Sequence, residues 1–254
     1  MKLGFIGTGE ITKAVVQGII KSKIKFSKIY ISRRNKKNSS NLRKLSRKIS
    51  IILDNQEIIN KSSWVFLAIT PKVGIKILKK LKFRKNQTII SFISTIKMSD
   101  LKKFTNSQSV LVRAIPLPPI SIMKGPVPLY PKNKKVSDFF NKIGNSLEIN
   151  NELSSLNFWA TSSLMASYYE LLNQTSNWLQ NRGVNKKIAQ KYVTSLYSAL
   201  SEVAVIKSEK DLKILVKDSQ TAGGLNEQTL KYLKKSGYFN KFKNSLDKIL
   251  KTLK

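Results

Sequence analysis

Residues 1–18 read MKLGFIGTGEITKAVVQG, and this stretch decides the fold of the chain. The apolar run Leu3–Ile6 is typical of a buried strand. Gly7, Thr8 and Gly9 interrupt it, and apolar residues then recur at the three- and four-residue spacing of a helix face. A strand, a tight turn and a helix in this order point free backbone N–H groups and the positive helix end at one place, which suits a phosphate.

The glycine turn therefore predicts a dinucleotide site. Gly7 allows the sharp turn, and Gly9 lets the backbone approach a pyrophosphate closely. Thr12 stands at the third position of the Gly-x-Gly-x-x-Gly/Ala fingerprint, where a smaller residue is usual because helix and strand pack closely there. The alternative is a turn that needs glycines for its geometry alone. The strand that follows at the expected distance favours the dinucleotide site.

The composition excludes several kinds of chemistry. The 254 residues include no Cys and no His, so the chain offers no disulfide, no Cys/His zinc site and no Cys/His or Ser/His nucleophilic site. The 14 acidic residues show no cluster that would hold a metal, and we expect none. We therefore expect a cofactor to carry the difficult chemical step while the protein positions the substrate.

The chain has no run of 18 apolar residues, and the glycine turn interrupts the first apolar run before it could act as a signal peptide. With the absence of Cys, this predicts a cytoplasmic protein with no membrane partner. The net charge of +33 would suit nucleic-acid phosphates. However, the lysines are spread along the chain and no nucleic-acid-binding signature is present, so we expect compositional bias and no specific nucleic-acid partner.

The second expected strand, Lys28–Ser32, is followed by residues that bear on the choice of cofactor. An NAD-preferring site would carry an acidic residue here, whereas this chain reads Ser32, Arg33, Arg34 and Asn35. A hydroxyl and two guanidinium groups suit the 2′-phosphate of NADP through charge-assisted hydrogen bonds. The sequence predicts NADP(H), and the alternative is that the two arginines are simply solvated cations.

Alternating strand and helix patterns continue to about residue 150 and predict a doubly wound α/β sheet of the Rossmann type. The further expected strands are 49–53, 63–69, 87–93 and 109–114. The expected helices between them are 41–48, a helix from the capping residue Asp54 to Asn60, and 71–81. The strand over 63–69 leads into Thr70, Pro71 and Lys72 at the edge where ligand crevices open.

Prolines dominate the next segment. Ile115–Pro119 predicts a stiff extended connector, and Gly125–Pro131 predicts an edge strand or a loop. A helix over 136–143 and a short strand over 146–149 then complete an expected NADP-binding domain, residues 1–150.

Beyond Asn151 no strand pattern recurs. Apolar periodicity predicts one helix from Glu152 to Arg182 that ends at Gly183, and further helices over 186–206, 209–218 and 237–254. These helices are more apolar than a single solvent-facing layer requires. We expect residues 151–254 to form an all-helical substrate and dimerisation domain of a homodimer or higher homo-oligomer. The alternative is a monomer with a compact helical cap.

A polar loop, residues 218–227, precedes a helix that begins near Leu225. Gly223 and Gly224 expose backbone N–H groups that suit a carboxylate, and Ser219 and Thr221 add hydroxyl donors. A simple helix–helix turn explains the same residues, and their spacing alone does not favour either interpretation.

The chain resembles the pyrroline-5-carboxylate reductase family. Five stretches carry the resemblance, in the order and spacing of the family, and they are GFIGTGEIT at 4–12, SRRN at 32–35, LAITPK at 67–72, VRAIPLPP at 112–119 and QTAGGLNEQ at 220–228. The resemblance implies an N-terminal Rossmann domain, a helical domain through which the protein dimerises, and reduction of a cyclic imine, 1-pyrroline-5-carboxylate, to proline with NAD(P)H.

The resemblance also implies roles for individual residues. The pyrophosphate would lie on Gly7, Thr8, Gly9, Glu10 and Ile11, and the adenosine 2′-phosphate on Ser32, Arg33, Arg34 and Asn35. The cofactor would be bordered by Ala68, Thr70, Pro71 and Lys72. The substrate carboxylate would bind Ser219, Thr221, Gly223 and Gly224, with Ser163 and Thr221 as weaker candidates for a catalytic role.

The substrate side departs from the family pattern. Leu117 replaces an Asn of the usual Met-Pro-Asn-Thr-Pro stretch, Ala222 replaces the Pro before Gly-Gly, and Leu225 with Asn226 replaces Thr-Thr. The family's Gly-Ser-Gly-Pro-Ala-Tyr helix start corresponds to 161–168. Two alternatives therefore stay open, a reductase of a related cyclic imine or other small acid, and a non-catalytic dinucleotide-binding protein. A β-hydroxyacid-type reductase is disfavoured because residues 152–182 contain no catalytic Lys.

Overall fold

The computed structural model describes residues 1–93 and 95–253, which form two compact units. The first unit contains Met1–Trp159 and Leu253, and the second contains Ala160–Thr252. The sequence predicted a domain boundary after residue 150. In the structure, the first turns of the next helix, up to Trp159, belong instead to the unit that contains the sheet.

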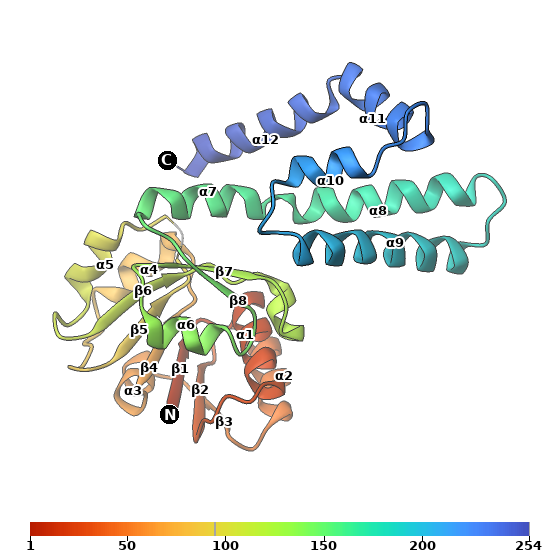
Figure 1. Cartoon of the computed structure of the whole chain (residues 1–254). Helices are drawn as coiled ribbons and strands as arrows, with labels where there is room; N and C mark the ends of the chain where they lie inside the picture. The colour runs from red at the N-terminus through yellow and green to blue at the C-terminus, as the bar shows by residue number, and fades with distance from the viewer. Residues whose placement is uncertain (94, 254) are drawn as a thin grey trace. The chain divides into compact units, whose positions relative to one another are not determined.

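The described part of the first unit contains one eight-stranded sheet (Figure 1). Its strands are β1 (Lys2–Ile6), β2 (Lys28–Ser32), β3 (Ile49–Ile52), β4 (Trp64–Leu67), β5 (Thr88–Ser91), β6 (Val110–Ala114), β7 (Pro126–Tyr130) and β8 (Asn145–Glu148). Their order is β3-β2-β1-β4-β5-β6-β7-β8, and only the β6–β7 pair is antiparallel. This confirms the predicted doubly wound α/β fold.

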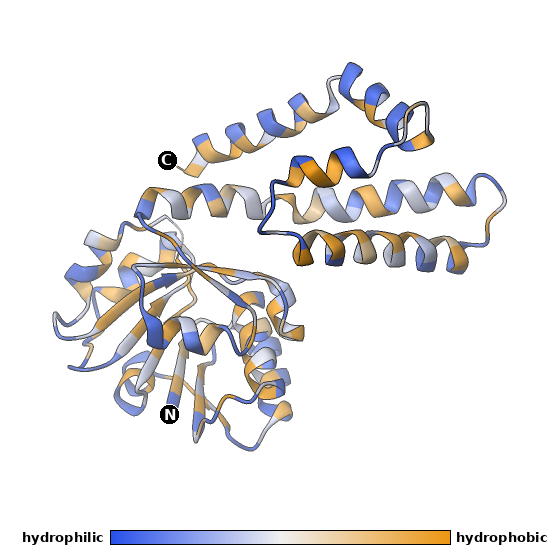
Figure 2. Ribbon diagram, in the orientation of Figure 1, coloured by the Kyte–Doolittle hydropathy of each residue, from blue (hydrophilic) through white to orange (hydrophobic). Residues whose placement is uncertain are grey.

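Helices cover both faces of the sheet. One face packs against α1 (Glu10–Lys21), α2 (Lys36–Leu45) and α6 (Lys134–Phe140), and the other against α3 (Asn55–Lys61), α4 (Pro71–Leu78) and α5 (Met98–Phe104). Successive residues of a strand point to opposite faces, so Leu3 and Phe5 join the first core and Ile6 joins the second. The strands are accordingly hydrophobic along most of their length (Figure 2).

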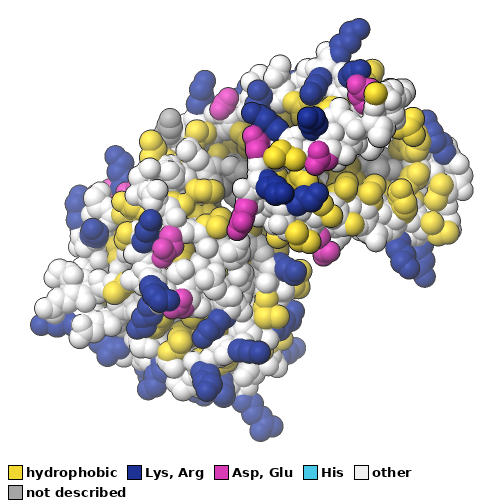
Figure 3. Space-filling view, viewed as in Figure 1, with side chains coloured by type: hydrophobic (Ala, Val, Ile, Leu, Met, Phe, Trp, Pro, Cys, Tyr) yellow, Lys and Arg dark blue, Asp and Glu magenta, His cyan; other side chains and the backbone are white. Residues whose placement is uncertain are grey.

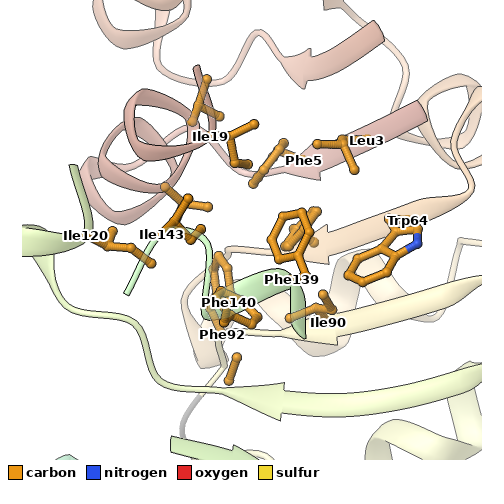
Figure 4. Packing of buried hydrophobic residues seen from close by; sticks show 14 of the residues in the cluster. Leu3, Phe5, Ile19, Trp64, Ile90, Phe92, Ile120, Phe139, Phe140 and Ile143 are labelled. Atoms are coloured by element: carbon orange, nitrogen blue, oxygen red, sulfur yellow. The ribbon is translucent and has the colours of Figure 1, made fainter. Parts of the chain in front are cut away.

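Aromatic rings fill the centre of the first core (Figure 4). Phe5 and Phe66 are fully buried and stack with their ring centroids 4.3 Å apart, and Phe139 of α6 lies 5.8 Å from Phe66. Such pairs contribute roughly 0.5–1.5 kcal/mol beyond the burial of their area. The packing fixes α6 over the middle of the sheet and leaves the carboxyl ends of the strands for loops.

The second unit is helical, as predicted. Its helices are α8 (Leu164–Gln180), α9 (Lys186–Ile206), α10 (Leu212–Asp218), α11 (Leu225–Lys235) and most of α12 (Tyr238–Leu253), with α7 (Glu152–Ser162) crossing the boundary between the units. Helices α8 and α9 pack side by side, with the rings of Tyr168 and Tyr197 edge to face at 6.2 Å.

Three predicted elements are wrong in detail. The single helix over 152–182 is two helices, because Ser163 donates both its N–H and its hydroxyl to the carbonyl of Ala160 and so interrupts the regular pattern. The helix over 41–48 is α2, which begins at Lys36 because Asn35 caps it. The connector 115–119 is not fully extended, because its last prolines begin a 3₁₀ helix, η1 (Pro118–Ile122).

The stretch 125–131 contains β7, which is not an edge strand because β8 pairs with its other side. The prolines at 126 and 128 are tolerated because they occupy alternate positions. The carbonyl of Pro128 accepts the N–H of Ile115, so these positions face β6, where pairing is limited to two residue pairs. Helix α5 was not predicted, since its seven residues give too short a periodic pattern.

Gly18 and Gly74 both lie inside helices and predict opposite responses to substitution. A Cβ at Gly18 would lie 2.4 Å from the carbonyl oxygen of Ile120, whereas a Cβ at Gly74 would lie 3.4 Å from the flexible ends of Ile93 and Ile96. We expect Gly18→Ala to destabilise the first unit by about 1–3 kcal/mol. We expect Gly74→Ala to be neutral or to stabilise it by roughly 0.5–1 kcal/mol through helix propensity.

Denaturant unfolding followed by tryptophan fluorescence, to which the buried Trp64 contributes, measures both effects. Equal losses of stability in the two variants would contradict the close approach of α1 to η1.

Candidate functional site

The candidate site lies where the order of the strands reverses. β1 stands between β2 and β4, and the chain leaves β1 toward β2 but returns through β4 on its other side. In such sheets a crevice opens outside the carboxyl ends of the two strands at this point. Gly7 follows β1 directly, and Ala68 follows β4.

The turn after β1 is in backbone contact with the end of β4. Gly7 has a φ of +102°, and a Cβ there would lie 2.1 Å from the carbonyl oxygen of Ala68. Only glycine satisfies both conditions, because other residues rarely adopt this φ and none lacks a Cβ. The predicted requirement for a glycine at position 7 therefore has two physical causes.

Gly9 is different, because a Cβ there would meet no protein atom within 4 Å. Gly9 is the N-cap of α1, and no side chain caps this helix end. The N–H groups of the first turn thus have no side-chain cap among the described residues, and they lie at the positive end of the helix dipole. This arrangement fits the pyrophosphate of a dinucleotide, which needs close backbone approach at this position.

Two buried hydroxyl groups hold the turn from beneath. Thr12 is fully buried and its hydroxyl donates to the carbonyl of Gly7 at 2.8 Å, which explains why the third fingerprint position accepts a residue larger than alanine. Ser32 is 4% exposed, and its hydroxyl oxygen accepts the N–H of Gly7 at 3.0 Å. Ser32 therefore lies under the turn, whereas its neighbours Arg33 and Arg34 are exposed.

Asn38 links the loops that follow β1 and β2. It is 4% exposed, and its side-chain amide donates to the carbonyl of Thr8 at 3.1 Å and to Glu10 Oε1 at 3.0 Å. The Thr8 hydroxyl oxygen accepts the N–H of Asn35, whose own side chain caps α2. The sequence analysis missed Asn38, because nothing in the sequence distinguishes it from the other uncharged residues of α2.

Glu10 lies at the first turn of α1, beside the open N–H groups. The hydrogen bond from Asn38 and the contact with Lys13 at 3.4 Å lower the pKa of the Glu10 carboxyl below its usual range. The Asn38 hydrogen bond directs this carboxylate toward α2, and the neighbouring arginines add positive charge to the same edge.

The predicted cofactor border after β4 is open at its surface. Thr70 is the exposed N-cap of α4, its carbonyl accepts the N–H groups of Val73 and Gly74, and Pro71 occupies the first turn. Lys72 is exposed and Ala68 is half-buried. These positions therefore lie along the same edge as the glycine turn, which the Gly7–Ala68 contact fixes.

The predicted substrate loop belongs to the second unit and connects α10 to α11. Gly223 has a φ of +71°, and its N–H already donates to Glu227 Oε2 at 2.8 Å. The hydrogen-bonded ion pair with Lys231 and, after it, this bond from Gly223 lower the pKa of the Glu227 carboxyl. One of the expected donors for a substrate carboxylate is thus engaged by a carboxylate of the chain itself.

The other members of this set are placed as follows. The N–H of Gly224 donates to the carbonyl of Thr221, and the carbonyl of Ser219 accepts the side-chain amide of Asn226. The Ser163 hydroxyl donates to the carbonyl of Ala160 at 2.7 Å, so its proton has a partner within its own helix turn. Among residues 1–93 and 95–253, no group of three acidic side chains could hold a metal, and no helix is long and apolar enough to span a membrane.

Comparisons with known proteins agree with this geometry. A family described as NADP oxidoreductase coenzyme F420-dependent matches residues 2–95. Pyrroline-5-carboxylate reductase 3 of Danio rerio is 29% identical over 128 residues, a match that covers 49% of this chain and 44% of that relative. The pyrroline-5-carboxylate reductase of Staphylococcus haemolyticus is 22% identical over a match that covers 97% of this chain and 94% of that relative.

Solved structures show the same fold. The 1-pyrroline-5-carboxylate reductase of Streptococcus pyogenes has a TM-score of 0.84 at 22% identity, covering 100% of this chain and 98% of its own. The Plasmodium falciparum pyrroline carboxylate reductase with NADP bound has a TM-score of 0.85 at 21% identity, covering 100% and 97%.

The chain is therefore similar, at low identity, to pyrroline-5-carboxylate reductases. This relationship supports an NAD(P)-dependent oxidoreductase.

The Asn38 hydrogen bonds give a prediction for this reductase-like site. In Asn38→Leu, the Glu10 carboxylate loses a donor to its charged form, so its pKa should rise toward the usual glutamate range. While Asn38 holds the Glu10 pKa low, the charged carboxylate stabilises the folded protein at pH values above the unfolded-state pKa. This stabilisation is lost as pH falls through the folded-state pKa. NMR titration of the Glu10 side chain measures the change.

Asn41→Leu is the matched control, since Asn41 is an exposed residue of the same helix. An unchanged Glu10 titration in Asn38→Leu would rule out the proposed link between the two loops.

Proposed function

We propose that the chain is an NADPH-dependent reductase that converts 1-pyrroline-5-carboxylate to proline in the cytoplasm. The observation that carries the proposal is the open backbone cradle at Gly9, held beside β4 by the glycine-only contact of Gly7. The similarity to pyrroline-5-carboxylate reductases over nearly the whole chain supports the substrate class.

The cofactor half would use residues of one sheet edge. Backbone groups of Gly7, Thr8, Gly9, Glu10 and Ile11 would hold the pyrophosphate, and the border would be formed by Ala68, Thr70, Pro71 and Lys72. Arg33 and Arg34 would bind the 2′-phosphate, with Asn35 and the buried Ser32 shaping the loop beneath them. When bound, the reduced nicotinamide supplies a hydride to the carbon of a C=N bond.

The protein's contribution to this reaction would be positioning. A protonated imine accepts a hydride readily, so the chain needs no strong base, which agrees with its lack of His and Cys. Holding two reactants in a productive geometry can supply about 7–11 kcal/mol of the barrier. The residues along the carboxyl edge would therefore act mainly by orientation and exclusion of water.

The substrate carboxylate would bind the loop that contains Ser219, Thr221, Gly223 and Gly224, with Ser163 as a weaker candidate near the imine. The contact between Glu227 and the N–H of Gly223 leaves fewer free donors in this loop than its sequence suggests. That observation favours a second candidate function, reduction of a related cyclic imine or another small acid. A non-catalytic dinucleotide-binding protein would need the cofactor half alone.

We also propose a homodimer formed through the helical unit. Many large apolar side chains of α8 and α9 are exposed in the single chain, including Trp178 at 55%, Tyr192 at 59% and Leu200 at 58%. Hydrophobic side chains are conspicuous on the visible face of the helical unit (Figure 3). Exposure on this scale is typical of a surface that a second copy covers.

The reaction is tested by NADPH oxidation at saturating 1-pyrroline-5-carboxylate, repeated with NADH and with 1-pyrroline-2-carboxylate. We expect turnover of the 5-carboxylate with NADPH. In Arg33→Gln/Arg34→Gln, loss of the charge-assisted bonds should raise the KM for NADPH by about tenfold or more and leave that for NADH unchanged.

Lys44→Gln/Arg47→Gln is the control, because it removes the same charge near the other end of α2. An equal rise in the KM for NADPH in both double variants would show that the arginines act only through their general positive charge. Turnover of only the 2-carboxylate would show that the substrate is the related cyclic imine. NADPH binding without any turnover would favour the non-catalytic alternative.

The dimer is tested by light scattering. We expect the wild type to have the mass of a dimer or a higher oligomer and Leu200→Glu to be monomeric, because a carboxylate at this apolar position opposes burial. Lys186→Glu, at the first turn of the same helix, is the control and should stay associated. A monomeric wild type would refute the dimer.

A further inference from the structure

An ion pair between a buried arginine and a half-buried glutamate lies at the carboxyl edge of the sheet. Arg113 of β6 is 2% exposed, and its Nη1 lies 3.1 Å from Glu152 Oε1 and 3.1 Å from Ser155 Oγ, both on α7. Among the described residues its Nε has no hydrogen-bond partner, whereas Nη1 and Nη2 both donate hydrogen bonds. Burial lowers the pKa of the Arg113 guanidinium, and the Glu152 carboxylate acts in the opposite direction.

The ion pair forms hydrogen bonds with both ends of a short loop. Arg113 Nη2 donates to the carbonyl oxygen of Ile96, and the N–H of Met98 donates to Glu152 Oε1 at 2.7 Å. The segment Ile96–Met98 connects β5 to α5 and is therefore tied to β6 and α7 at once. Buried ion pairs are weak sources of stability, because desolvation offsets much of their attraction. Their value here lies in fixing the position of the loop.

The loop forms part of a cavity of about 340 Å³, a size that suits a small ligand. Its wall includes Thr95, Ile96, Lys97 and Leu156 together with the ion pair. β5 pairs in register with both β4 and β6, so this cavity lies along the same edge as Ala68 and Thr70, on the side away from β2. A ligand that begins at the Gly7–Gly9 turn with its adenosine toward β2 extends in this direction.

We propose that Arg113 and Glu152 are positioning residues for the reacting end of the site. They hold Ile96–Met98 as a fixed wall against which the imine and the reactive ring of the cofactor are oriented, and they act through the position of this loop. This inference rests on the proposed reductase function.

The experiment compares Glu152→Ala, Glu152→Gln and a control variant, Gln87→Leu. Gln87 is 2% exposed and donates to the carbonyls of Ile59 and Ser62 at the opposite end of β5, so its loss is a purely structural perturbation. For each variant we would measure Tm, the Kd for NADPH by fluorescence titration, kcat and KM for the imine, and hydrogen exchange of peptides that cover Thr95–Met98.

In Glu152→Ala we expect faster exchange of these peptides and a kcat lowered about tenfold or more, since small misplacements of reacting groups have effects of this order. The Kd for NADPH should stay within about threefold, because the glycine turn and the arginines that bind its other end are untouched. Glu152→Gln keeps an acceptor for the Met98 N–H, so it should restore much of the protection and part of kcat. Gln87→Leu should lower Tm without lowering kcat.

Unchanged exchange in Glu152→Ala would overturn the proposal, as would a kcat loss of equal size in Gln87→Leu. If Glu152→Ala does not fold, the same comparisons apply to Glu152→Gln. A wild type that binds NADPH but reduces no imine would refute the proposed function instead, and exchange of the Thr95–Met98 peptides would then decide whether the ion pair fixes the loop.

Discussion

The close approach of Gly7 to the carbonyl of Ala68 is the constraint on which the candidate site depends. It joins the carboxyl ends of β1 and β4 more closely than any side chain would allow. The turn must then leave β1 with a positive φ, which aims the start of α1 across the crevice at the point where the strand order reverses. Gly9 lies beyond this contact, directly before the start of α1, and a Cβ there would meet no atom within 4 Å.

A turn fixed so closely has backbone groups that are removed from water, and the chain satisfies them with short polar side chains. Ser32 accepts the N–H of Gly7, Thr12 donates to its carbonyl, and Asn38 donates to the carbonyl of Thr8. An unpaired buried polar group would be destabilising by about 1–3 kcal/mol, so these residues are part of the turn as much as the glycines are. They also connect the loop after β1 to the loop after β2, and so link the glycine turn to the segment that carries Arg33 and Arg34.

These details mark the limit of what the sequence could predict. The order of strands and helices, the glycine turn and the helical second half follow from local periodicity and turn chemistry, and the structure agrees. Asn38 and Arg113 could not be found in this way, because their importance depends on partners 17 to 42 residues away. The break at Ser163 was missed because a serine hydroxyl that bonds its own helix turn leaves no periodic signal. The strand at Pro126–Tyr130 was uncertain because prolines are tolerated only at positions that depend on which neighbours pair.

The acidic residues of this basic chain show a common use. The chain has only 14, and three of them fix loops at candidate sites by accepting N–H groups. Glu10 accepts from Asn38, Glu152 from Met98 and Glu227 from Gly223. Hydrogen bonds and cationic partners favour the charged form of Glu10 and Glu227, which lowers their pKa values and makes them poor proton carriers near neutral pH. A chain that commits its carboxylates to loop geometry, and has no His or Cys, is suited to a reaction in which orientation does most of the work.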